Sequence, residues 1–241
     1  MATMRSSSAT ATRSRRTPFF IELYRSALGK KYVMAITGII GLGYIFAHMV
    51  GNLKLYQGPE ALDDYAKFLK NLLYPIVPQS AILNGLRAVL VLALIFHVLA
   101  AVQLTRMNRL ARPTRYKTRD YIAANFASRT MRWTGVIVLL FLVYHLSDFT
   151  WKTVNTAPAG ATLREVVIAS FSQPLIAGFY IVANLALGVH LFHGVWSLFQ
   201  SMGWNNRRFN HWRRGLAIGF TAVVIGGNLS FPIAVLTGFI S

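Results

Sequence analysis

Five of the six histidines of this 241-residue chain lie within long apolar segments, and they are His48, His97, His145, His190 and His193. Imidazole binds redox metals through nitrogen, and it also takes up and releases protons near neutral pH. A titratable group inside hydrocarbon is costly unless it is paired or ligated. Taken alone, each histidine could still be a hydrogen-bonded structural residue, but five together favour a functional interior.

The elements that must position these rings are helices. A helix rises ~1.5 Å per residue and needs about 20 apolar residues to cross ~30 Å of hydrocarbon. Five segments reach that length without the alternation of a strand, at about residues 32–53, 81–104, 133–149, 174–199 and 215–240. We therefore predict an all-α, polytopic membrane protein whose five transmembrane helices form a bundle over residues 27–241, preceded by a basic tail at 1–26.

The basic residues predict how the chain is oriented. The chain is 54% hydrophobic and 13% charged with a net charge of +18, and 19 of its 25 Lys and Arg lie on one side of the five predicted spans. Basic residues gather in cytoplasmic loops, so we expect a cytoplasmic N-terminus and an external C-terminus. The Arg-rich and Ser-rich residues 1–18 leave open a transit peptide. The basic stretch 105–121 lies between two spans, so we expect no nucleic-acid binding.

Depth along the helices sorts the histidines into two levels. Counted from the nearest inner charge, His48 lies ~25 Å and His145 ~20 Å into the membrane, whereas His97 lies only ~14 Å from Arg106. His190 lies ~15 Å from the inner end of its span. We therefore expect an outer pair, His48 with His145, and an inner pair, His97 with His190 or His193.

Two imidazole pairs from four helices suit two haems, each with its iron held by one histidine from either side. Polar or small residues share the faces of these histidines, which favours an interior position. Four glycines could give a flat macrocycle room between the helices, and they are Gly38, Gly41, Gly135 and Gly188.

Other chemistry is open for the same residues. Asp148 lies one turn from His145 and could join a proton relay, or it could form an ion pair with Lys152 at the helix end. His190 and His193 lie three residues apart on one face, so they could hold a Rieske-type [2Fe-2S] cluster. The chain contains no cysteine, so the thiolates of such a cluster would have to come from a partner.

Four stretches resemble a known family. They are SALGKKYVMAITGIIGLGYIFAHMVGNLKLYQGPEALDDYAKFL (26–69), FHVLAAVQLTRMNRLARPTRY (96–116), ASRTMRWTGVIVLLFLVYHLSDFTW (127–151) and HLFHGVWSLFQSMGW (190–204). Together they are similar to the single-chain, five-helix cytochrome b membrane anchor of succinate dehydrogenase and fumarate reductase.

The resemblance implies a membrane-anchor and electron-transfer subunit of respiratory complex II. In that family a flavoprotein subunit oxidises succinate, an iron–sulfur subunit carries the electrons to the anchor from the cytoplasmic side, and the anchor passes them to quinone. Di-haem relatives have axial ligands at the positions of His48, His97, His145 and His190. His193 is an addition to that pattern, and it leaves the shared iron–sulfur cluster open as an alternative to haem b.

The quinone site is less determined than the histidine pairs. Candidates are Asn84 and Arg87 near the outer level, and Arg25, Ser26 and Lys30 at the inner rim, although each could simply anchor a helix at the membrane interface. Alternative functions are a stand-alone di-haem cytochrome, a proton-coupled transporter, or an anchor without metal.

Overall fold

A computed structural model of the chain describes residues 18–111, 126–204, 206 and 210–241. Most of the basic residues that predict the orientation lie outside these ranges, at 5–16, 112–125 and 207–208. The described residues form eight α-helices and one short 3-10 helix. These elements are α1 (Phe19–Arg25), α2 (Ala27–Asn52), η1 (Leu53–Tyr56), α3 (Ala61–Lys70), α4 (Ala81–Leu110), α5 (Phe126–Phe149), α6 (Leu163–Phe171), α7 (Pro174–Ser201) and α8 (Asn210–Leu236).

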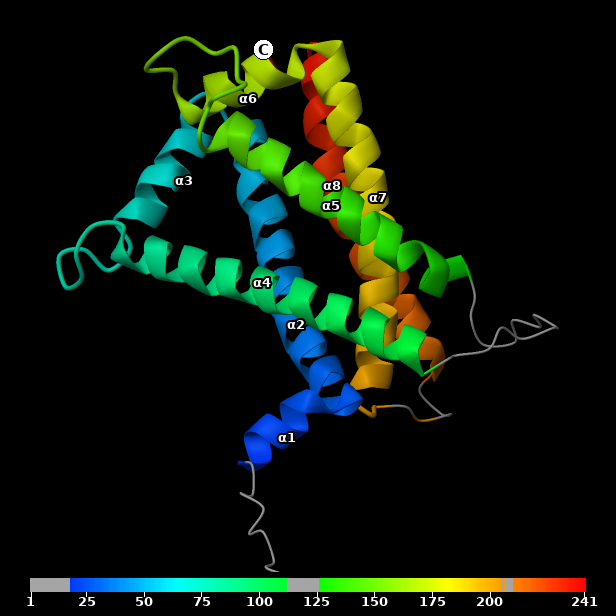
Figure 1. Ribbon diagram of the computed structural model, residues 1–241. Coiled ribbons are helices and arrows are strands. Elements are labelled where there is room, and N and C mark those ends of the chain that lie inside the picture. Colours follow the sequence, from blue (N-terminus) through cyan, green and yellow to red (C-terminus); the bar gives the residue numbers. More distant parts are fainter. Residues whose placement is uncertain (1–17, 112–125, 205, 207–209) are drawn as a thin grey trace, which may run out of the picture.

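Five of the helices are long and apolar enough to cross a membrane. They cover Ala27–Tyr56, Ala81–Leu110, Thr130–Phe149, Pro174–Ser201 and Asn210–Leu236. The part of the chain that is described contains no strand, so the all-α prediction is confirmed along with the five spans. The C-terminus and α1 lie at opposite ends of the bundle (Figure 1), and we name these ends the α6 end and the α1 end. Which end faces the cytoplasm stays a prediction.

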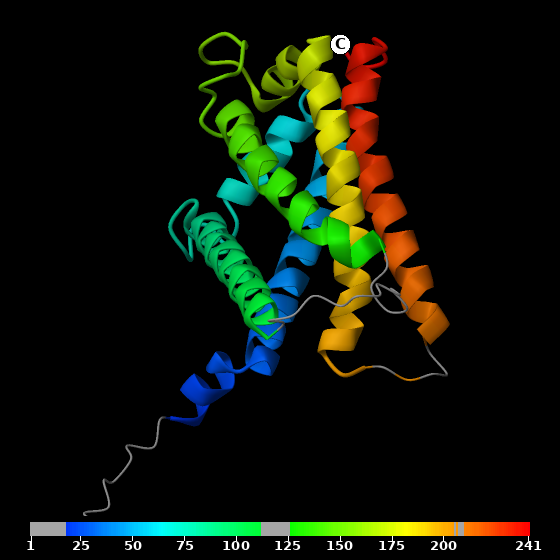
Figure 2. The ribbon, with the colours of Figure 1, turned by 45° about the vertical axis from the view of Figure 1, so that its right-hand side comes forward.

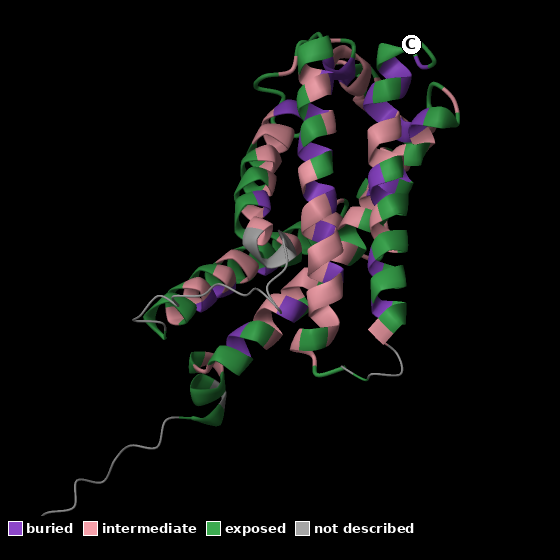
Figure 3. Cartoon of the chain, turned by 90° about the vertical axis from the view of Figure 1, so that its right-hand side faces the viewer, coloured by how far each residue is buried: buried purple, intermediate pink, exposed green. Residues whose placement is uncertain are grey.

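The spans pack in pairs. Helix α2 packs on α4, α5 packs on α7, and α7 packs on α8, whereas no comparable packing joins α4 to α5 or to α7 among the residues described. Helices α4 and α5 run obliquely to α2, α7 and α8 (Figures 1 and 2). Helix α7 carries many of the buried positions, and the outer faces of the other spans are exposed (Figure 3). Exposed apolar side chains on these faces are expected where lipid replaces water.

The junction between α1 and α2 is built from local polar contacts. The Ser26 hydroxyl accepts a hydrogen bond from the Gly29 amide and donates one to the Leu23 carbonyl, so it caps the start of α2. Lys30 is buried and donates to the carbonyls of Tyr24 and Arg25, which are left free at the end of α1. Residues 19–25 of the predicted tail therefore form a short helix attached to the first span.

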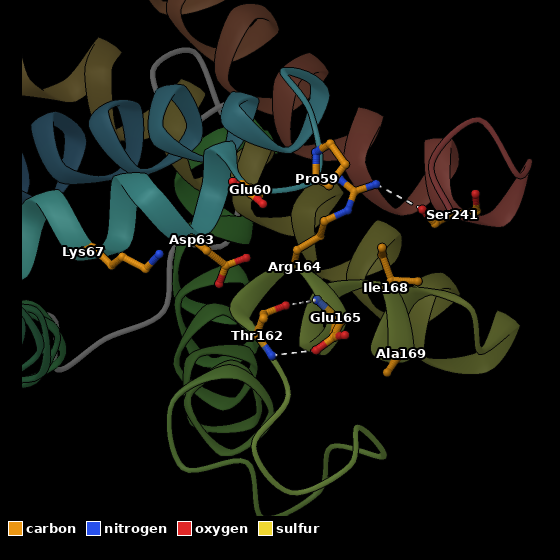
Figure 4. Close-up of a pocket in the computed structure, with 10 residues that line it drawn as sticks. All are labelled: Pro59, Glu60, Asp63, Lys67, Thr162, Arg164, Glu165, Ile168, Ala169 and Ser241. Carbon is orange, nitrogen blue, oxygen red and sulfur yellow. Dashed lines mark hydrogen bonds between the residues drawn. The ribbon is translucent and has the colours of Figure 1, made fainter.

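At the α6 end, two short helices and the chain end are tied together by hydrogen bonds. Thr162 and Glu165 form a capping box at the start of α6, and Asp63 of α3 accepts a hydrogen bond from the Leu163 amide. Arg164 donates to the carbonyl of Leu55 in η1 and to that of Ser241 beyond α8, and Figure 4 shows the second of these hydrogen bonds. The pocket in Figure 4 lies among these contacts, and none of the five intramembrane histidines lines it.

On α3, beside that pocket, Lys67 donates a 3.0 Å hydrogen bond to Asp64. This hydrogen bond and the negative charge of Asp64 raise the pKa of Lys67. Both side chains are largely exposed, so the pair contributes little to stability.

Candidate cofactor site

The structure brings four histidine rings together as two pairs between the spans. His48 of α2 and His145 of α5 have ring centroids 5.8 Å apart with perpendicular planes. His97 of α4 and His190 of α7 have centroids 6.4 Å apart with planes inclined by 65°. Over the described ranges, each pair is made by two helices that do not pack closely on each other. The pairing agrees with the one expected from depth along the helices, while the role of these rings as ligands stays a prediction.

Two threonines fix the rings of the pair nearer the α1 end. The Thr37 hydroxyl lies 3.1 Å from His97 Nδ1, and the Thr134 hydroxyl lies 3.3 Å from His190 Nδ1. Each threonine also donates its single proton to carbonyls of its own helix, at Val33 for Thr37 and at Thr130 for Thr134. The hydroxyl oxygens therefore accept from Nδ1–H, which leaves Nε2 of each ring as a free lone-pair donor.

The pair nearer the α6 end has a different environment. His145 Nδ1 is buried and has no hydrogen-bond partner among the described residues. Aromatic rings surround this histidine, with Phe149 at 5.2 Å, Phe141 at 5.7 Å and Tyr180 at 6.0 Å between centroids. The Tyr44 ring stacks on His48 at 5.4 Å with an interplanar angle of 16°. A buried imidazole nitrogen without a partner is costly unless a ligand or another group bonds that nitrogen.

Two glycines face the threonine-held rings, and a Cβ at either position would be in ordinary van der Waals contact with the ring. A Cβ at Gly38 would lie 3.6 Å from His97 Cε1, and one at Gly135 would lie 3.4 Å from His190 Cε1. No atom lies within 4 Å of the Cβ position of Gly41, and its place beside a cofactor stays a prediction. The prediction for Gly188 was wrong, because its Cβ position faces Ile225 of α8 at 3.1 Å and it serves the packing of α7 on α8.

A repeated spacing connects these features, and it was not among the predictions from the sequence. Helix α2 has Thr37 and Gly38 followed by His48, and α5 has Thr134 and Gly135 followed by His145 at the same intervals. Thr37 and Gly38 of α2 lie beside His97 of α4, and Thr134 and Gly135 of α5 lie beside His190 of α7. The later histidines of α2 and α5, His48 and His145, form the second histidine pair with each other. Comparing the two spans in register would have shown the repeat.

The donor geometry fits haem better than a bare metal ion. The described residues contain no group of three or more His, Asp or Glu side chains that could hold an ion. Haem supplies four nitrogens itself and needs two from the protein, on opposite sides of the iron. A metal–nitrogen bond of about 2 Å and the size of the imidazole ring place the two centroids roughly 6 Å apart. Both histidine pairs match that separation.

The remaining predicted site residues lie outside the two pairs. His193 is one turn from His190 toward the α1 end, and its ring contacts that of Phe192. Arg87 and Asn84 are exposed on α4 and bonded to each other at 3.1 Å. At the α1 end, Ser26 and Lys30 have their polar groups engaged in the helix junction. Arg25 is exposed beside that junction.

Asp148 does not form the ion pair considered from the sequence. Within the described residues the Lys152 amine donates to the Ala161 carbonyl instead. The Asp148 carboxylate is completely buried and accepts hydrogen bonds from Asn155, Ser170 and Tyr180. No local sequence pattern indicates these partners, because they come from a loop and from two other helices.

Comparisons with known proteins agree with this architecture. Residues 105–229, just over half of the chain, match the family described as succinate dehydrogenase/fumarate reductase transmembrane subunit. The succinate dehydrogenase cytochrome b558 subunit of Bacillus subtilis (strain 168) is 27% identical over 173 residues, which cover 70% of this chain and 77% of that protein. No solved structure matches the chain. The chain therefore belongs to the succinate dehydrogenase/fumarate reductase transmembrane subunit family, as its sequence motifs had indicated.

Proposed function

We propose that this chain is the membrane-anchor and electron-transfer subunit of a succinate:quinone oxidoreductase, and that it holds two b haems. The His48–His145 pair would hold one haem and the His97–His190 pair the other. Each haem supplies reversible one-electron transfer when bound. The observation that carries the proposal is the pair of ring separations, 5.8 Å and 6.4 Å, between helices that do not pack closely on each other. The cytochrome b name of the Bacillus relative supports the same cofactor.

The protein's contribution to electron transfer is to fix positions and to exclude water. The hydroxyls of Thr37 and Thr134 orient two of the rings, so that Nε2 of each ring is available to iron. The apolar helices around the pairs keep the electron path in a low-dielectric interior. Two haems at different depths give electrons a route from one membrane surface toward the other.

The partners follow from the family. A flavoprotein subunit would oxidise succinate, and an iron–sulfur subunit would dock at the α1 end, which the charge distribution predicts to be cytoplasmic. The chain would then lie in a bacterial plasma membrane as a multi-pass subunit, surrounded by lipid. Its enzymatic share is quinone reduction, and it takes no part in the chemistry of succinate.

The half of α4 that lies nearer the α6 end suits a quinone site better than the α1 end of the bundle does. Arg87 and Asn84 present exposed donors on this helix. The Tyr44 ring, which stacks on His48, belongs to the neighbouring helix α2. By contrast, Ser26 and Lys30 use their polar groups in the α1–α2 junction. We therefore assign quinone reduction to the neighbourhood of Arg87 and the His48–His145 pair.

A Rieske-type cluster shared with the iron–sulfur subunit is the alternative at the inner level. It would use His190 and His193 together. The His190 ring is instead directed toward His97 of α4 and is held by Thr134 of α5, an arrangement that favours ligation across the bundle.

Purification of the tagged complex from membranes tests this function. We expect a flavin-containing subunit and an iron–sulfur subunit to copurify, and we expect succinate to reduce a b-type haem that is visible in the reduced-minus-oxidised spectrum. The absence of any flavin-containing partner would contradict the complex II assignment. A complex without haem that instead shows a Rieske-type paramagnetic signal would contradict the cofactor assignment.

A further inference from the structure

Asp148 is a buried carboxylate that electron transfer as described above does not use. Its side chain is fully buried near the α6 end of α5. Moving a carboxylate out of water costs several kcal/mol unless hydrogen bonds and a counter-charge compensate. Such a group needs a reason to be there, because a neutral side chain of similar shape would pack at a smaller cost.

Three neutral donors surround the carboxylate. Asn155 Nδ2 donates to Oδ1 at 2.7 Å, while the Ser170 hydroxyl at 2.5 Å and the Tyr180 hydroxyl at 2.9 Å donate to Oδ2. Ser170 and Tyr180 are themselves buried. These donors come from the loop after α5, from α6 and from α7, so they hold the carboxylate rigidly as an acceptor.

No cation neutralises the group within the described residues. Lys152, one turn along the chain, directs its amine to the Ala161 carbonyl. Arg164 of the neighbouring α6 donates to the carbonyls of Leu55 and Ser241. Hydrogen bonds from neutral donors stabilise a negative charge but do not cancel its field.

The site proposed for a haem is the nearest place where positive charge would develop. Asp148 lies three residues after His145, hence on the same face of α5. The Tyr180 ring joins the two residues, because its hydroxyl bonds Asp148 while its centroid lies 6.0 Å from that of His145. An oxidised haem carries one positive charge more than the reduced haem, and in low dielectric a carboxylate this close stabilises the oxidised form.

We propose that Asp148 is the fixed counter-charge of the cofactor at the His48–His145 pair and lowers the reduction potential of that cofactor. The proposal rests on the proposed function, because it requires a haem at this pair. The His97–His190 pair has threonine hydroxyls beside its rings and no carboxylate bonded nearby among the described residues. The effect of Asp148 is therefore specific to one of the two cofactors.

The test is a redox titration of both haems in the intact complex carrying Asp148→Asn. This change removes the charge and keeps the shape and part of the hydrogen bonding. We expect the potential of the haem at the His48–His145 pair to rise and that of the other haem to stay the same. Asp64→Asn removes the same charge from an exposed carboxylate at the same end and should leave both potentials unchanged.

A second variant separates electrostatics from packing. Tyr180→Phe keeps the Asp148 carboxylate and removes one of its hydrogen-bond donors. The negative charge of Asp148 then acts more strongly on the His48–His145 pair, so the reduction potential of the haem at that pair should fall. If Asp148 acted through packing alone, the reduction potential of this haem would shift in the same direction in Asp148→Asn and in Tyr180→Phe, and that result would overturn the proposal. An Asp148→Asn complex that contains both haems at unchanged potentials would also overturn it. If the complex contains no haem at all, the proposed function fails instead, so the two failures are distinguishable.

Discussion

At the scale of single residues, two of the proposed ligand rings are held by side chains that are not themselves proposed ligands. Thr37 and Thr134 accept hydrogen bonds from the rings of His97 and His190, and they do so from helices other than those that carry the rings. A hydrogen bond of this kind fixes the orientation of a metal-binding imidazole and raises its basicity.

Thr134→Val tests this support at one ring. Valine keeps the branched shape and removes the hydroxyl, so His190 Nδ1 loses its partner. We expect haem affinity at the His97–His190 pair to fall by about 10-fold to 100-fold, as for other outer-shell losses, measured as haem retained per chain during purification. Thr134→Ser keeps the hydroxyl and is the matched control. Equal haem retention in the valine and serine variants would show that the hydroxyl plays no part.

At the scale of elements, much of the architecture could be predicted from the sequence. The five spans were predicted because 20-residue apolar segments have few alternatives to a membrane helix. Depth predicted the pair His48 with His145 and left His97 to pair with His190 or His193, because a regular helix converts residue number into distance. Both arguments use only local sequence and helix geometry.

Other features could not be predicted because they depend on contacts between distant segments. Gly188 was assigned to the cofactor space, but it packs against α8, since spacing within a helix does not identify which neighbour a face meets. The partners of Asp148 come from three separate segments. The short helix α1 arises where Ser26 caps α2, within residues predicted as a tail.

The five crossings place α1 and α6 on opposite sides of a membrane, and cysteine labelling can determine which side is which. The chain has no cysteine of its own, so single substitutions report cleanly. We expect Ala159→Cys, in the exposed loop before α6, to react with an impermeant maleimide on intact cells. Ser7→Cys should react only after the cells are permeabilised. The reverse pattern would contradict the orientation predicted from the basic residues.

At the scale of the whole molecule, the chain is a scaffold that holds two histidine pairs at different depths. Helices α2 and α5 each contribute a histidine to one pair and a threonine and glycine to the other, so the two sites share the same supports. Helix α8 packs against α7 and contributes no ring to either pair among the described residues. The four helices that carry the pairs are thus the functional unit that we propose, and α8 packs against it.

The most direct measurement of the central claim is the number of b haems bound per chain in the purified complex. The account predicts two haems in the unaltered protein and one in either His97→Ala or His145→Ala, because each variant removes one ligand from one pair. The controls His193→Ala and His211→Ala should keep both haems. No haem in the unaltered complex, or two haems in His97→Ala and His145→Ala alike, would contradict the claim that these rings hold the electron-transferring iron.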